Sequence, residues 1–193
     1  MGLPGAGKSS VGPRLAARLG RAFDDLDALV AREAGRGVAA ILREEGEAAF
    51  RALEREALRR ALGPRPGGAA PAPARALVVL ACGGGIVTDR ESRELLASGA
   101  TIVWLTVRSE TALARLGAAG VAARPLLAGP GHPADEAGDD GGALARLEEL
   151  QETRNPLYDS IAALRLATDG RSPDEVAADV EEGLRRRWAF SAS

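Results

Sequence analysis

The chain has 193 residues, of which 46% are hydrophobic and 27% charged, and its net charge is −2. This length suits one globular domain, and the near-neutral charge gives no reason to expect a binder of nucleic acids or membrane surfaces. One cysteine, Cys82, excludes an internal disulfide and fits a reducing cytoplasm, and no apolar run reaches the roughly 20 residues that span a bilayer.

The first residues contain a complete phosphate-binding loop, Gly2-Leu3-Pro4-Gly5-Ala6-Gly7-Lys8-Ser9. In such a loop, backbone N–H groups surround phosphate oxygens, the lysine reaches the β- and γ-phosphates, and the hydroxyl of Ser9 can bind Mg²⁺. Apolar residues four apart predict a helix over 8–19, whose N-terminus adds a favourable dipole. The alternative is a chance glycine-rich turn. The nucleotide contacts that we expect are Gly5, Ala6, Gly7, Lys8, Ser9 and Ser10.

A short strand-like segment over 22–25 ends in the acidic tripeptide Asp25-Leu26-Asp27. If this stretch is extended, both carboxylates share a direction and can face a cleft at the sheet edge. One could hold the water shell of magnesium, and the other could accept a proton from a substrate hydroxyl. Alternatively, the two acids cap the helix that begins near Ala28, which is the better interpretation if the tripeptide is taken alone.

Helical patterns follow over about 28–34 and 46–62. In the second of these, Arg51 and Glu54 are three residues apart and so share a face. A carboxylate there can fix the guanidinium group so that it binds an anion through two hydrogen bonds. The common alternative is a solvated surface ion pair.

Residues 63–76 are rich in proline, glycine and alanine and predict a solvent loop. Buried strands are predicted over 77–81 and 101–105. The first runs into Gly83-Gly84-Gly85, which permits a close approach of backbone and ligand or forms a flexible turn.

The last third contains two candidate arginines. Arg124 follows a helix over 109–116 and a glycine- and alanine-rich stretch, so it could swing over a transferring phosphoryl group or simply precede a helix-stopping proline. Arg154 precedes Asn155-Pro156-Leu157-Tyr158 and is similarly ambiguous. Residues 128–143 are acidic and glycine-rich, which predicts a mobile surface insertion. A strand over 164–168 and a helix over 173–187 complete one domain, residues 1–193.

The alternation of strand and helix predicts an α/β fold with a parallel sheet flanked by helices in three layers. One feature is unusual for this fold. A phosphate-binding loop should follow a strand that directs it toward the phosphates, but only Met1 precedes Gly2.

The order of these motifs resembles the shikimate kinases. The phosphate loop is followed by Phe-x-Asp-x-Asp, Gly-Glu-x-x-Phe-Arg-x-x-Glu, the glycine triplet, Arg-Pro-Leu-Leu and Arg-x-Pro-Leu-Tyr. The matching segments span nearly the whole chain: 2–9, 23–27, 46–54, 83–85, 124–127 and 154–158.

The resemblance implies that the protein phosphorylates the 3-hydroxyl of shikimate with ATP and Mg²⁺, on the route to aromatic amino acids. It implies that Asp27 orients or deprotonates this hydroxyl, that Arg51 and Arg154 bind the shikimate carboxylate, and that Gly84 and Gly85 line the pocket. The remaining roles are metal support by Ser9 and Asp25, phosphate binding by Lys8, an adenine contact by Arg115, and a lid over about 109–127 that carries Arg124. We expect a cytoplasmic monomer whose ligands are ATP and shikimate.

The family has a five-stranded sheet of order 2-3-1-4-5, and its central first strand is missing here. We therefore expect that the chain is truncated and that its true start lies upstream of Met1; a stable, fully active protein of this length would contradict that expectation. The loop over 63–76 and the insertion over 128–143 also look longer than is usual in the family. Two other functions stay open: a related small-molecule kinase, such as a gluconate or nucleoside monophosphate kinase, and an inactive module that binds or regulates.

Overall fold

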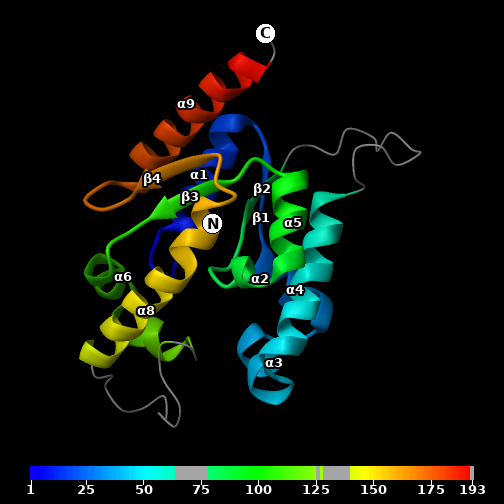
Figure 1. Cartoon of the computed structure of the whole chain (residues 1–193), viewed down its shortest axis with the longest axis vertical. Coiled ribbons are helices and arrows are strands. Elements are labelled where there is room, and N and C mark those ends of the chain that lie inside the picture. Colours follow the sequence, from blue (N-terminus) through cyan, green and yellow to red (C-terminus); the bar gives the residue numbers. More distant parts are fainter. Residues whose placement is uncertain (64–77, 125–126, 128–139, 192–193) are drawn as a thin grey trace.

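The computed structural model describes residues 1–63, 78–124, 127 and 140–191, shown as coloured ribbons in Figure 1. Helices surround short parallel strands, as predicted for an α/β fold. The strands of the described residues are β1 (Ala22–Asp25), β2 (Val78–Ala81), β3 (Val103–Thr106) and β4 (Leu164–Ala167). Each lies at a predicted position, although β3 begins two residues later than the predicted 101–105.

The helices include all those that the sequence pattern predicts and several that it does not. Helices α3, α5 and α8 and the short helix η1 were not predicted, because α3 and η1 are short, α5 has few apolar residues, and glycine and proline interrupt the pattern of α8. The bounds are α1 (Lys8–Leu19), α2 (Leu26–Ala34), α3 (Val38–Glu44), α4 (Gly46–Leu62), η1 (Ile86–Thr88), α5 (Arg90–Gly99), α6 (Ser109–Ala122), α8 (Asp140–Asp159) and α9 (Pro173–Ser191).

The strands form two separate parallel pairs. Strand β1 pairs with β2, with Ala22 opposite Val78, and β3 pairs with β4, with Val103 opposite Leu164. Within the described residues, β2 and β3 are not paired with each other. These pairs match the outer pairs of the order 2-3-1-4-5, and the complete order stays a prediction.

Met1 forms backbone hydrogen bonds with β3, on the edge that is not paired with β4. Its amino group donates a hydrogen bond to the Val103 carbonyl at 2.8 Å, and the Leu105 N–H donates to the Met1 carbonyl at 3.0 Å. Burial lowers the pKa of this amino group to about 6, because the charged form loses its water. The chain therefore enters the phosphate loop in a direction that β3 sets.

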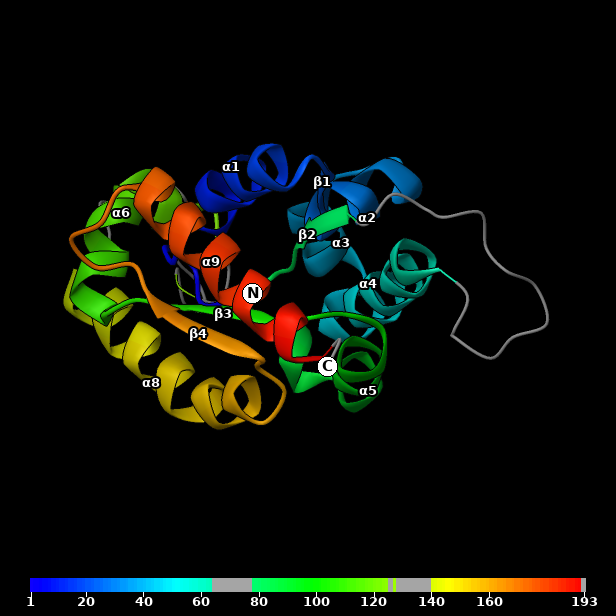
Figure 2. The same ribbon diagram turned by 90° about the horizontal axis from the view of Figure 1, so that it is seen from above.

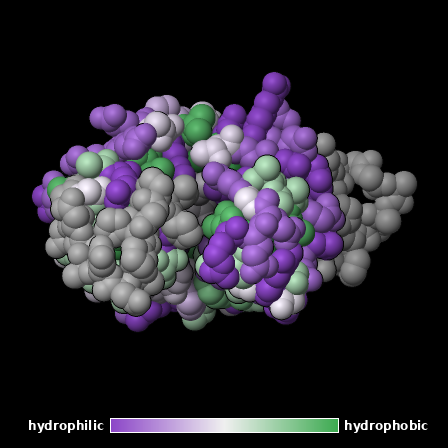
Figure 3. All heavy atoms as spheres, turned by 90° about the horizontal axis from the view of Figure 1, so that it is seen from below, coloured by the Kyte–Doolittle hydropathy of each residue, from purple (hydrophilic) through white to green (hydrophobic). Residues whose placement is uncertain are grey.

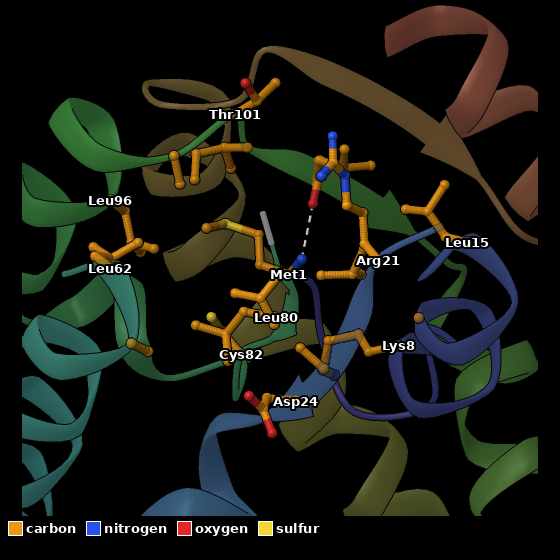
Figure 4. A pocket seen from close by; sticks show the side chains of 18 of the residues that line it. Met1, Lys8, Leu15, Arg21, Asp24, Leu62, Leu80, Cys82, Leu96 and Thr101 are labelled. Atoms are coloured by element: carbon orange, nitrogen blue, oxygen red, sulfur yellow. Dashed lines mark hydrogen bonds between the residues drawn. The ribbon is translucent and has the colours of Figure 1, made fainter. Parts of the chain in front are cut away.

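A large cavity lies between the two pairs of strands, which Figure 2 shows well separated. Its volume is about 1040 Å³, and its walls include β2, β3 and the facing sides of α1 and α9. Figure 4 shows Met1, Leu80 and Cys82 gathered in it, with Lys8 and Asp24 nearby. Its lining is mainly apolar, and Cys82 is buried there as a small core residue, as expected.

Two hydrophobic clusters stabilise the halves of the molecule. One joins α2, α3, α4 and α5 and includes Trp104 and Tyr158; the other joins α1, α6, α8 and α9 to β3. Helices α1 and α9 lie on one side of β3 and β4, and α8 lies on the other, so the flanking helices that the sequence predicts are confirmed (Figure 2). On the face shown in Figure 3, hydrophilic side chains predominate over the half with α3 and α4.

The sequence predicted an insertion over 128–143 and a solvent loop over 63–76. The bounds of the insertion need correction, and most of both segments lies outside the described residues. The insertion predicted over 128–143 ends earlier, because residues 140–143 begin α8, and Ala143 is buried in the second cluster rather than exposed. The acidic, glycine-rich composition of this segment did not indicate that its last residues are helical. Residues 128–139 of the insertion, and the loop over 63–76 beyond Gly63, lie outside the described part of the chain. None of the described helices is both long and apolar enough to cross a bilayer.

Candidate active site

The phosphate loop has the backbone conformation that its glycines permit. Gly5 and Gly7 have φ values of 77° and 85°, in the left-handed region that residues with a Cβ rarely adopt. A Cβ on Gly5 would also lie 2.7 Å from the backbone of Ala112 in α6. Helix α1 begins at Lys8, with Ser9 and Ser10 exposed in its first turn. The loop therefore packs tightly on α6 while it directs the N-terminus of α1 toward the site.

Lys8 lies at the centre of a group of charges. Its Nζ donates a hydrogen bond to the Leu3 carbonyl at 2.9 Å. Its pKa is lowered to about 8, mainly by burial and also by nearby Arg124, whereas Asp27 and Asp25 act in the opposite direction. These four side chains, predicted separately from the sequence, are thus close enough to interact electrostatically.

Asp25 and Asp27 are arranged differently from the extended prediction. The chain enters α2 at Leu26, and Asp25 caps this helix by accepting a hydrogen bond from the Asp27 N–H at 3.0 Å. The capping alternative is therefore confirmed for Asp25, and the extended interpretation is wrong because Asp27 is already helical. Desolvation and Asp25 raise the pKa of the Asp27 carboxyl, while Lys8, Arg51 and Arg124 lower it. Asp27 is nevertheless close enough to Lys8 and Arg51 for their charges to act on it.

Arg51 is held between two carboxylates of α4. Its Nη1 donates to Glu54 Oε2 at 2.6 Å, and its Nη2 donates to Glu47 Oε1 at 2.9 Å. The side chain of Glu54 is only 1% exposed, so the solvated surface pair is excluded. Burial raises the pKa of Glu54 to about 7, although Arg51 opposes this rise. The predicted fixation of the guanidinium group by Glu54 is confirmed.

The glycine triplet forms the wall between these groups. A Cβ on Gly83 would lie 3.1 Å from Asp27 Oδ1 and 3.4 Å from Glu54 Oε1. One on Gly85 would lie 2.0 Å from Arg51 Nη2, and one on Gly84 would lie 3.0 Å from the Gly2 carbonyl. Each glycine thus admits a protein neighbour that a side chain would displace, and the close approach of this backbone to a ligand stays a prediction.

Arg154 comes from α8 to the same region. It is 6% exposed, and desolvation, with a contribution from the charge of Arg51, lowers its pKa. Tyr158 lies one helical turn later; its hydroxyl donates to the Gly84 carbonyl at 2.6 Å. The sequence interpretation assigned no role to Tyr158. The spacing of four from Arg154 could have revealed it, but Pro156 obscured the helix that makes this spacing meaningful.

Arg115 and Arg124 both belong to the α6 region. Arg115 donates to the carbonyls of Gly5 and Thr168 at 3.2 and 2.5 Å, so it connects the phosphate loop with the end of β4. Its expected adenine contact stays a prediction. Helix α6 is broken at Gly117, where φ is 60° and ψ is 177°, within the stretch where a hinge was expected. Arg124 lies beyond this break and donates to the Gly120 carbonyl at 2.6 Å.

The candidate metal ligands are oxygen atoms. The Ser9 hydroxyl and the Asp25 carboxylate are hard donors, and Mg²⁺ typically takes one or two protein oxygens in addition to phosphate oxygens and water. The described residues contain no group of three or more His, Cys, Asp or Glu side chains that could hold a metal by themselves. The donors at the phosphate loop thus fit a magnesium ion that is bound together with a nucleotide.

Comparisons with known proteins show which family this chain is similar to. The family model described as shikimate kinase matches residues 4–185. A shikimate kinase of Symbiobacterium thermophilum is 40% identical over 97% of this chain and 95% of that protein, and one of Streptomyces coelicolor is 42% identical over 91% and 88%. Among solved structures, a shikimate kinase from Acinetobacter baumannii in complex with shikimate has a TM-score of 0.80 at 29% identity, covering 96% of this chain and 90% of that one.

Proposed function

Since the chain belongs to the shikimate kinase family, we propose that it transfers the γ-phosphoryl group of ATP to the 3-hydroxyl of shikimate, giving shikimate 3-phosphate and ADP. The observation that carries this proposal is a single site in which Arg51 and Asp27 flank the Gly83–Gly85 wall, next to the phosphate loop. Shikimate, an anionic polyol, requires both a carboxylate-binding cation and a hydroxyl-binding carboxylate.

The acceptor half of the site consists of two arginines and an aspartate. Arg51 and Arg154 would bind the shikimate carboxylate, and Glu54 already holds Arg51 in place. Gly84 and Gly85 would line the ring of the acceptor. Asp27 would accept a hydrogen bond from the reacting hydroxyl, and its raised pKa favours it as a proton acceptor. This arrangement fixes the acceptor before the chemical step, which lowers the entropic part of the barrier.

The phosphate half consists of the loop from Gly5 to Ser10 and two further cations. Lys8 would bind the β- and γ-phosphates, Arg124 would approach the transferring group from the lid, and Arg115 would lie near the adenine. Ser9 and Asp25 would hold Mg²⁺, which would supply positive charge that offsets the charge of the phosphates. Because phosphoryl transfer needs mainly positioning and charge stabilisation, these residues provide what the reaction requires.

We extend the proposal to the organisation of the chain. Residues 1–193 would form one domain, with residues 109–127 as a lid that moves at the break in α6. Glycine with a φ of 60° at position 117 supports this placement of the hinge. We also propose that the protein works as a monomer in the cytoplasm, where its one cysteine is buried and reduced.

An ADP-release assay with a panel of acceptors tests the proposed function. Shikimate, gluconate and AMP are each supplied with ATP and Mg²⁺; we expect turnover with shikimate and at most a small fraction of it with the others. The methyl ester of shikimate is the matched control, because it keeps the hydroxyls and removes the charge that the arginines bind. Absence of turnover with shikimate would overturn the proposal, and calorimetric binding of shikimate without turnover would favour a binding module.

A further inference from the structure

One hydroxyl group connects two walls of the acceptor site. Tyr158 is completely buried near the C-terminal end of α8, and its hydroxyl donates a hydrogen bond to the Gly84 carbonyl at 2.6 Å. The guanidinium group of Arg154 hydrogen-bonds to the same phenol. Arginine has only donors, so the phenolic oxygen accepts from Arg154 while its proton is donated to Gly84.

The ring that carries this hydroxyl is held firmly. It packs on Trp104 of β3, with ring centroids 5.5 Å apart and an angle of 31° between the planes. Trp104 is itself buried, and the Arg165 guanidinium lies 4.5 Å above its ring. Aromatic packing of this kind, together with complete burial, restricts the movement of the ring. The position of the hydroxyl is therefore set by β3, independently of any ligand.

Gly84 is confined between this hydroxyl and the phosphate loop. A Cβ built on Gly84 would lie 3.1 Å from the Tyr158 hydroxyl and 3.0 Å from the Gly2 carbonyl. The hydroxyl thus holds the glycine wall at a fixed distance from the loop. Because Arg154 shares the same hydroxyl, a shift of the wall and a shift of the carboxylate-binding arginine are coupled.

We propose that Tyr158 is a positioning residue for the acceptor: its hydroxyl fixes the Gly84 carbonyl and the Arg154 guanidinium in the arrangement that binds the acceptor carboxylate. The inference rests on the proposed function, since it assigns a role within that site. Tyr158 does not contact the reacting atoms, so it acts on acceptor binding rather than on the chemical step. Among the described residues, the hydroxyl of Tyr158 bonds to Gly84 and Arg154 and not to a residue of the phosphate loop, which with α1 forms the nucleotide half of the site.

Tyr158→Phe separates this role from a purely structural one. The ring and its packing on Trp104 remain, while the buried Gly84 carbonyl loses its donor. We expect the KM for shikimate to rise about tenfold, because leaving a buried polar group unpaired costs more than the hydrogen bond itself contributes. The kcat and the KM for ATP should stay within about twofold.

Ser160→Ala is the matched control, since the Ser160 hydroxyl also donates to a backbone carbonyl, that of Leu157, at 2.8 Å but is exposed. Ser160→Ala should leave kcat and the KM values for shikimate and ATP unchanged. An unchanged KM for shikimate in Tyr158→Phe, or an equal rise for ATP, would overturn the inference while the proposed function stands. Absence of shikimate turnover in the unaltered chain would overturn both.

A second measurement needs no substitution, because Tyr158 is the one tyrosine of the sequence. Uniform labelling with 3-fluorotyrosine gives a single fluorine resonance that reports on this hydroxyl. We expect saturating shikimate to shift the resonance, and a non-hydrolysable ATP analogue alone to leave it in place. If Tyr158→Phe fails to fold, this titration decides: a resonance that does not respond to shikimate would overturn the inference.

Discussion

Glu54→Gln is the perturbation whose consequences the structure specifies most closely. The Glu54 side chain is 1% exposed, its Oε2 accepts from Arg51, and its Oε1 has no hydrogen-bond partner among the described residues. Burial raises its pKa to about 7 from the usual 4.5, and the charges of Asp27 and Asp89 act in the same direction. Arg51 opposes the rise but does not cancel it. The folded protein therefore disfavours the ionised form of this group.

The sign and size of the effect follow from linkage between protonation and folding. Below pH 4.5 both the folded and the unfolded chain hold the proton, so the group leaves the free energy of unfolding unchanged. Between pH 4.5 and about 7 the unfolded chain loses its proton first, and stability falls as pH rises. At 1.36 kcal/mol per pKa unit, the loss amounts to about 3 kcal/mol above pH 7.

Glutamine removes this titration while it keeps an oxygen that can accept from Arg51. The stability of Glu54→Gln relative to the unaltered chain should therefore rise by about 3 kcal/mol between pH 4.5 and pH 8. The KM for shikimate should rise about fivefold at pH 8, because a hydrogen bond to a charged acceptor holds Arg51 more firmly than one to an amide.

Urea unfolding at four pH values from 5 to 8 measures the stability difference. Glu47→Gln is the matched control, because it removes the other carboxylate partner of Arg51. The side chain of Glu47 is 52% exposed. Exposed ion pairs contribute little, so its curve should run parallel to that of the unaltered chain. A stability difference for Glu54→Gln that is constant across this range would refute the reasoning.

Three further predictions concern the site and the strands. Asp27→Asn should nearly abolish turnover with shikimate while ATP binding, measured by calorimetry, is retained; near-normal turnover would remove Asp27 from the mechanism. Gly85→Ala should raise the KM for shikimate at least tenfold, because the added Cβ would lie only 2.0 Å from Arg51 Nη2 and would displace it. Gly37→Ala should leave the KM unchanged, because its added Cβ meets nothing within 4 Å. An engineered N-terminal extension of four β-branched apolar residues should raise the Tm, because it can pair with the edges of β2 and β3 that face the cavity. An equally long Gly-Ser extension should leave the Tm unchanged. Equal Tm values for the two extended proteins would contradict the pairing.

Local spacing predicted the parts of the site that lie on continuous elements. The three-residue separation of Arg51 and Glu54 predicted their ion pair, because both lie on one uninterrupted helix. Gly85 was expected to permit a close approach of backbone and ligand; in the structure the Arg51 guanidinium group fills the space that its missing side chain leaves. Only the first of these depends on residues near one another in the chain, because Arg51 and Gly85 come from different elements.

The remaining parts depend on contacts between distant segments. The helical start at Leu26 overrode the extended pattern of the acidic tripeptide, because Asp25 satisfies the N-terminus of α2. Helix α8 continues past Pro156, where only the last turn loses a hydrogen bond, and this brings Tyr158 onto the face of Arg154. The bond from Tyr158 to Gly84 joins residues 74 positions apart, which no local pattern reveals.

The central claim is that this site directs phosphoryl transfer to one particular hydroxyl of shikimate. Correlation NMR between ³¹P and ¹H on the product of a reaction with ATP, Mg²⁺ and shikimate tests it most directly, because it identifies the carbon that carries the new phosphate. We predict a single product in which the phosphorus couples to the proton at C3, formed by the unaltered chain and not by Asp27→Asn. Phosphorylation at another position, a mixture of positions, or no phosphorylated shikimate would contradict the account.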